Sequence, residues 1–156
     1  MTTAQITALN QMLAKIIEKL HGPDSINYSV SAKIWHCPIA AGSAAIEIIR
    51  SVLLDKVELR AVNAAKPQNV LENLKTCLEF SGDTGAHPDL DYLNSPQAKQ
   101  DQEQFLGEIS NFIQGSDSIS NLFLAEGHPF YPVFWDFAYL IEKGPDAYLF
   151  IASSSD

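Results

Sequence analysis

Residues 133–152 read VFWDFAYLIEKGPDAYLFIA, and this stretch decides the fold. Two apolar segments rich in aromatic residues flank the tetrapeptide KGPD, at Lys143–Asp146. Glycine and proline between two β-prone segments are typical of a hairpin turn. We therefore predict two antiparallel strands, from Val133 to Glu142 and from Ala147 to Ala152, and expect the serine-rich tail at 153–156 to fray.

Three segments upstream of the hairpin also have strand character. Residues 26–36 alternate apolar and polar side chains, the period expected of a half-buried strand. Residues 57–62 alternate over a shorter distance, and a longer helix or a hairpin across this region would fit them equally well. Residues 122–125 form a short apolar run that ends at Gly127, where a break is expected.

Helical periodicity occupies most of the remaining chain. Apolar residues recur at helical spacing over residues 3–20, from Ser43 to Leu53 and over 67–80. A further helix begins at Ser95 and Pro96, a favourable cap and first-turn pair, and ends near Gly115. Its first two turns are almost wholly polar, so we expect them to project into solvent.

The order of these elements predicts an α+β fold in a single domain that spans residues 1–156. We expect an antiparallel sheet, formed by the C-terminal hairpin and one or two further strands, packed against about four helices on one side. A chain of this length buries enough surface to support one ordinary core. The strand order is not determined by the sequence.

The composition narrows the classes of protein that fit. Cys37 and Cys77 are too few to indicate a disulfide framework, and free buried thiols are the expectation. No segment resembles a signal peptide, and no apolar run approaches the roughly 18 residues that span a bilayer. We therefore expect a soluble, cytoplasmic protein that does not associate with membranes.

The acidic charge is concentrated in the second half of the chain. Residues 79–156 hold 13 of the 19 acidic residues but only two of the ten basic ones, Lys99 and Lys143. Nucleic acids and anionic membranes bind clustered lysine and arginine, so this distribution argues against both. It is compatible with a basic protein partner, with a cationic ligand or with a role in solubility alone.

The same half of the chain is rich in aromatic residues. Nine of the chain's fifteen aromatic residues lie between Phe123 and Phe150. We expect most of them to be core, with Trp135, Phe137 and Tyr139 on one face of a strand. Aromatic residues that stay exposed beside acidic ones would form a surface for a basic partner. The residues predicted for this surface are Glu126, His128, Phe130, Tyr131, Phe134 and Asp136.

The segment at 81–94 is the longest predicted loop. It carries Asp83, His87, Asp89 and Asp91, which together with Glu126 and His128 would supply the acids and bases of a small enzyme, with or without a metal ion. The favoured interpretation is simpler, because aspartates in turns commonly bond their own backbone. His87, Asp89 and Asp91 are therefore only weak metal candidates, and no cofactor is expected.

A cysteine nucleophile paired with a distant histidine is also conceivable. Cys37 follows His36 directly, but no glycine-rich elbow surrounds it, and a buried structural cysteine is the favoured interpretation. Phosphate-binding and dinucleotide-binding glycine motifs are absent from the sequence.

Three functional hypotheses follow from these patterns. The leading one is a non-enzymatic acidic module, such as an inhibitor or an immunity or antitoxin-like protein, that binds a basic protein partner. The alternative is the small enzyme described above. The third is a homo-oligomer that associates through an exposed edge of the terminal hairpin.

Overall fold

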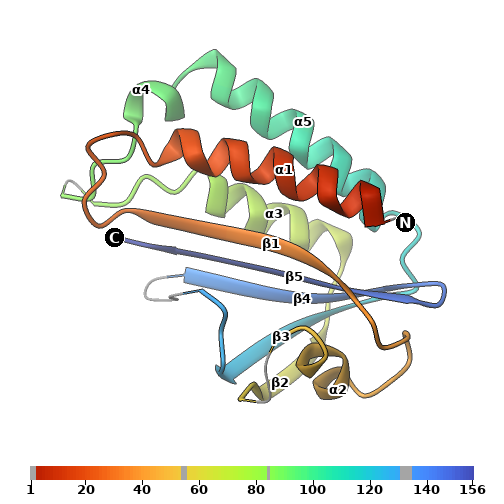
Figure 1. The fold of residues 1–156 in the computed structure, drawn as a ribbon. Helices are drawn as coiled ribbons and strands as arrows, with labels where there is room; N and C mark the ends of the chain where they lie inside the picture. Colours follow the sequence, from red (N-terminus) through yellow and green to blue (C-terminus); the bar gives the residue numbers. More distant parts are fainter. Residues whose placement is uncertain (1–2, 54–55, 84, 131–134) are drawn as a thin grey trace.

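The computed structural model describes residues 3–53, 56–83, 85–130 and 135–156. One antiparallel sheet runs through the molecule, with its five strands in the order β1-β5-β4-β3-β2 (Figure 1). The strands are β1 (Ser29–Cys37), β2 (Glu58–Ala64), β3 (Ser118–Glu126), β4 (Trp135–Lys143) and β5 (Asp146–Ser155). The helices and this sheet confirm the predicted α+β class.

The predicted hairpin forms the middle of the sheet. β4 and β5 pair continuously from Trp135 opposite Ser154 to Lys143 opposite Asp146. β1 lies against the outer side of β5, and β3 lies against the outer side of β4. The hairpin is therefore not at the edge of the sheet, as the homo-oligomer hypothesis required, because β1 pairs along the length of β5 and β3 pairs with residues 139–142 of β4.

The helices are α1 (Thr3–Leu20), α2 (Ala45–Arg50), α3 (Pro67–Leu78), α4 (Leu90–Leu93) and α5 (Pro96–Ile113). α1, α3 and α5 lie together on one face of the sheet, whereas the short α2 lies on the opposite face (Figure 1). The helix beyond the expected four is α4, a single turn within the predicted 81–94 loop. Within the described residues, no helix combines the length and the apolar character needed to cross a membrane.

Both faces of the central hairpin are buried. Phe137, Tyr139 and Phe150 face the three long helices, and the Phe137 and Phe150 rings meet edge to face at 5.1 Å. On the opposite face, Leu149 and Ile151 pack with residues of α2. Most aromatic residues of the second half are thus core, as predicted, because the hairpin is enclosed on both sides.

The serine-rich tail is part of the sheet. Ser153, Ser154 and Ser155 are buried in β5, where they pair with the first residues of β1. The prediction that this tail frays is wrong, because neighbouring strands satisfy its backbone on both sides. The predicted strand at 26–36 is shorter at its start, since Ile26 lies outside β1 and is 72% exposed.

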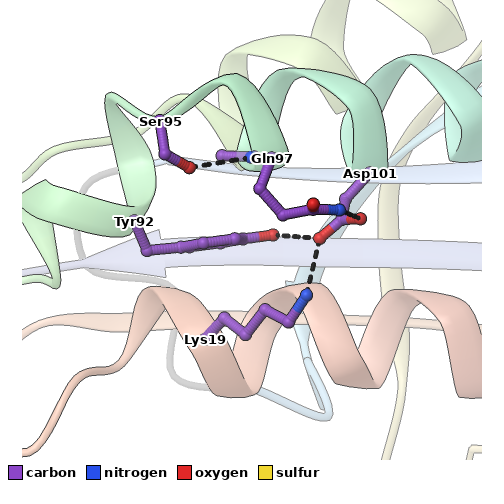
Figure 2. Close-up of polar contacts among 6 residues, drawn as sticks. Lys19, Tyr92, Ser95, Gln97 and Asp101 are labelled. Carbon is purple, nitrogen blue, oxygen red and sulfur yellow. Dashed lines mark hydrogen bonds and ion pairs between the residues drawn. The ribbon is translucent and has the colours of Figure 1, made fainter.

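The polar first turns of α5 are packed rather than solvated. Gln102 is buried, and its side-chain amide donates to the Leu78 carbonyl at 3.2 Å. Asp101 accepts hydrogen bonds from Lys19 at 2.7 Å and from Tyr92 at 2.9 Å (Figure 2). Gln97 donates to the second Asp101 oxygen at 2.7 Å. The expectation that these turns project into solvent is therefore wrong.

This network joins α1, α4 and α5. The Lys19 ammonium, which is the strongest influence, and the Gln97 and Tyr92 donors hold the pKa of Asp101 below its usual value, against a smaller opposing effect of burial. The Lys19 ammonium also lies 5.2 Å from the centre of the Tyr92 ring. Each polar group of the cluster thus has a partner within the molecule, which is typical of a structural rather than a binding role.

Candidate functional site

The predicted partner surface lies where β3 ends and the chain returns toward β4. Phe130 packs against Trp35 of β1, with their ring centres 6.2 Å apart. The described part of this connection, residues 127–130, therefore folds back over the face of the sheet that α2 covers. Gly127 allows the backbone to turn here, because its φ of +78° is one that glycine adopts readily. A larger residue would also collide with the chain just before β2, since a Cβ at this position would lie 2.8 Å from Val57 Cα.

A surface pocket of about 390 Å³ opens beside this connection. Its size falls within the range of pockets that accept a small molecule or a bulky side chain. Trp35 is half-buried in its wall, and the Lys33 ammonium lies 5.2 Å from the centre of the indole. We call this feature the His128 pocket; its lining residues are Trp35, Val52, Leu53, Lys56, Val57, Gly127, His128 and Pro129.

The His128 ring holds the connection in place. Its side chain is only 8% exposed. His128 Nδ1 lies 3.1 Å from the Phe130 nitrogen and 3.0 Å from the Phe130 carbonyl oxygen, so it accepts from the N–H in one tautomer and donates to the carbonyl in the other. Nε2 is covered and has no hydrogen-bond partner among the residues that the structure describes, and it lies 3.6 Å from Asp136 Oδ2. His128 is thus not placed to act on a substrate as an exposed base.

Burial keeps this imidazole neutral. The pKa of His128 lies below its ordinary value of 6.5, because desolvation disfavours the charged ring. The Phe130 backbone and the Asp136 carboxylate oppose this effect only in part. His128 therefore behaves as a buried, neutral anchor of the connection near neutral pH.

Carboxylates lie beside the pocket. Glu126 is exposed at the end of β3 and stands directly opposite Glu58 of β2 in the strand register. Asp136, at the start of β4, has a side chain that is 46% exposed. Within the described part of the chain, neither Glu58 nor Glu126 has an ion-pair partner. Because like charges opposite each other on adjacent strands are unfavourable, this arrangement would be relieved by a cation from outside.

The structure thus brings together four of the six residues predicted for the partner surface. Glu126, His128, Phe130 and Asp136 all lie at this end of the sheet, whereas Tyr131 and Phe134 lie outside the described residues. Sequence reasoning missed the other half of the site, which comes from β1 and from the segment between α2 and β2. Its residues are Trp35, Val52, Leu53, Lys56, Val57 and Glu58.

The loop residues of the enzyme hypothesis lie elsewhere. Asp83, His87, Asp89 and Asp91 line a separate pocket of about 380 Å³, together with residues 22–24. The alternative acid–base group, which joined these residues to Glu126 and His128, is therefore divided between two pockets.

The aspartates of this loop bond their own backbone. Asp83 accepts from the Gly85 N–H at 2.7 Å, and Asp89 accepts from the Tyr92 N–H at 2.8 Å and so caps α4. These are the contacts of turn-forming aspartates, as the favoured interpretation predicted. Among the residues that the structure describes, no three histidine, cysteine or acidic side chains are grouped closely enough to hold a metal ion.

The cysteines are not placed as nucleophiles. Both are free and buried, and burial raises the pKa of each thiol, Cys37 and Cys77, to about 12. A thiol at that pKa forms almost no thiolate at neutral pH. His36, the sequence neighbour of Cys37, instead bonds Asp146 at 2.9 Å through Nε2.

The buried histidine predicts a pH dependence of stability. Because the pKa of folded His128 is below 6.5, its contribution is complete above pH 6.5 and is lost as the pH falls through the folded value. The free energy of unfolding, measured with urea, should therefore be lower at about pH 5 than at about pH 7.5. His128→Asn, which keeps an acceptor for the Phe130 N–H, should reduce this difference. His87→Asn, at an exposed position, should leave it unchanged; equal slopes in all three proteins would contradict the assignment.

Comparison with known proteins found no protein similar to this chain. No protein-family model, no curated protein and no solved structure gives a significant match to the chain.

Proposed function

We propose that the protein is a non-enzymatic binding module that recognises a basic protein partner at the His128 pocket. The observation that carries the proposal is the position of the exposed carboxylates of Glu126 and Asp136 beside an apolar pocket with Trp35 in its wall. Such a surface suits a segment in which an apolar side chain is flanked by lysine or arginine.

The two parts of this surface have different roles in binding. An apolar side chain that enters the pocket removes apolar area from water, and aromatic residues such as Trp35 commonly dominate interface energies. The carboxylates accelerate association and select partners of opposite charge. Because the carboxylates are exposed, their part of the affinity should decrease as salt screens them.

Proteins of this kind act by binding a partner and blocking its surface, without changing it chemically. An inhibitor or an immunity or antitoxin-like protein that neutralises a basic toxin or enzyme is the class we favour. The burial of His128 Nε2 and the raised pKa values of both thiols support binding over catalysis. We place the protein in the cytoplasm, where two free cysteines are the common state.

Capture from a native lysate with matched variants tests this proposal. The tagged protein is compared with Glu126→Gln/Asp136→Asn and with Glu103→Gln/Asp91→Asn, which removes the same two charges at exposed positions elsewhere. Bound proteins are identified by mass spectrometry at about 50 mM and about 500 mM salt.

We expect one basic protein that the wild type and the control variant retain at low salt. The same protein should be depleted at high salt and should bind the Glu126→Gln/Asp136→Asn variant at least about tenfold more weakly. Equal loss in both variants would mean that only net charge matters, and capture of no basic protein by the wild type would contradict the proposal.

A further inference from the structure

The two edges of the sheet differ in a way that bears on self-association. The outer edge of β1 is covered by side chains of α1. Asn10 donates to the Ile34 carbonyl at 2.7 Å and accepts from the Ile34 N–H at 2.9 Å, so its amide satisfies both outward groups of that residue. His21 lies 3.4 Å from the Val30 N–H. These contacts block the addition of another strand at β1.

The outer edge of β2 has no such cover among the described residues. The Ala65 N–H donates to the Ile119 carbonyl of β3 at 2.8 Å, and β2 pairs with β3 without interruption from Ala61 to Ala64. Because alternate residues of an antiparallel strand direct their backbone groups to the same side, Val62 and Ala64 direct theirs outward. An exposed edge of this kind is a template for strand pairing.

Exposed apolar side chains coincide with this edge. Val62 is 45% exposed, and Phe123, which faces its neighbour Ala61 from β3, is also 45% exposed. Among the described residues, only two other large apolar side chains, Ile26 and Leu90, are as exposed as these. Of the two outward-directed residues, Val62 is the one nearer the middle of β2, where a symmetry axis between two copies would pass.

We propose that two copies of this chain associate through antiparallel pairing of their β2 strands about a two-fold axis at Val62. In this register Ala64 of each copy lies opposite Arg60 of the other. Glu58 of each copy lies beside Lys66 of the other, so this pair occurs twice, once at each end of the paired strands. This inference does not depend on the proposed function, since it rests on the edge residues Arg60, Val62 and Lys66, which lie outside the His128 pocket; Glu58 belongs to both surfaces.

Charge complementarity selects this register. A shift of the strands by two residues places Arg60 opposite Lys66 in one direction and Lys56 level with Lys66 in the other, and both are pairs of like charges. Glu58 has no cationic partner within the described chain and faces Glu126, so a lysine from a second copy would relieve that repulsion. Both Glu58 and Lys66 are exposed, and their long side chains can meet across the offset that the β-bulge at Arg60 introduces.

The contrast between the edges also determines the size of the assembly. Because α1 covers the β1 edge, the sheet can extend only at β2. Pairing of identical surfaces about a two-fold axis then closes after two copies. A single strand from each copy buries little area, so the dimer should be weak and should depend on protein concentration.

Sedimentation velocity over about 10 μM to about 1 mM protein tests this inference. The wild type should show a reversible monomer–dimer equilibrium. Glu58→Lys and Lys66→Glu should each raise the dissociation constant at least about tenfold, because each variant places like charges together at both ends. An equimolar mixture of the two variants should recover dimerisation, since every pair in the mixed dimer is again complementary.

Two further variants keep the test specific. Val62→Asp places two carboxylates at the axis and should abolish the dimer, while circular dichroism checks that this exposed substitution leaves the fold intact. Glu103→Lys, with the same charge change as Glu58→Lys on the exposed surface of α5, should leave the dissociation constant unchanged. A wild type that is monomeric at every concentration, or a dimer that persists in the Val62→Asp variant or is not recovered in the mixture, would overturn the inference.

Discussion

Replacing Phe150 by alanine is expected to lower the free energy of unfolding by about 3–5 kcal/mol, the usual cost of truncating a buried aromatic ring. Phe150 is fully buried in β5, an inner strand of the sheet between β1 and β4. Its ring meets Phe137 edge to face at 5.1 Å, and it stands between Ile34 of β1 and Tyr139 of β4. The substitution therefore leaves a cavity that surrounding strands cannot readily close. Urea unfolding followed by circular dichroism measures the loss.

Phe123→Ala supplies the matched control. It removes the same atoms from the same sheet, but the side chain is 45% exposed, so the cost should be below about 1 kcal/mol. Similar losses for the two variants would mean that the terminal hairpin is not the centre of the core.

The second large effect is expected at Gly127. Alanine there should lower the free energy of unfolding by about 2–4 kcal/mol, because steric overlap adds to backbone strain. The added Cβ would lie 2.8 Å from Val57 Cα and 2.9 Å from Val57 Cγ2, at a φ of +78°. Since Gly127 and Val57 both line the His128 pocket, the change should also weaken partner capture.

Gly115→Ala distinguishes the cost of steric overlap from the cost of backbone strain at a positive φ. Gly115 has a similar φ of +70°, but a Cβ there would meet no atom within 4 Å. Its substitution should therefore cost only the strain, about 1 kcal/mol, and should leave capture unchanged. Equal costs at the two glycines would show that the close contact between Gly127 and Val57 does not constrain the connection.

Much of the fold is predictable because local signals coincide with it. α1 has an uninterrupted apolar stripe, Pro67 and Ser95–Pro96 begin helices as expected, and KGPD forms the central turn. Each of these signals acts over a few residues, so tertiary contacts are not needed to interpret it.

The errors occur where distant strands decide the outcome. Ser153–Ser155 read as a polar tail, yet all three pair with β1, and Ser153 and Ser154 also pair with β4. Gln102 lies in a polar stretch but is buried against the Leu78 carbonyl. In both cases hydrogen bonding to a segment far away in the sequence permits burial that local composition argues against.

In the candidate site, too, some features follow from local sequence and others depend on distant segments. Glu126, His128, Phe130 and Asp136 are close in the sequence, so they could be grouped before the structure was known. The opposite wall, which includes Trp35 and Val57, depends on where β1 and the α2–β2 segment lie in space. The pairing of Glu58 with Glu126 depends on strand register, which the hydrophobic pattern of these short strands did not specify.

Hydrogen–deuterium exchange of the chain, alone and bound to its captured basic partner, tests the binding surface most directly. We predict that the partner protects backbone amides at 33–37, 52–58 and 126–130, while the 81–91 loop and α5 exchange as in the free protein. Protection confined to that loop or to α5, with no change around the His128 pocket, would contradict the proposed function.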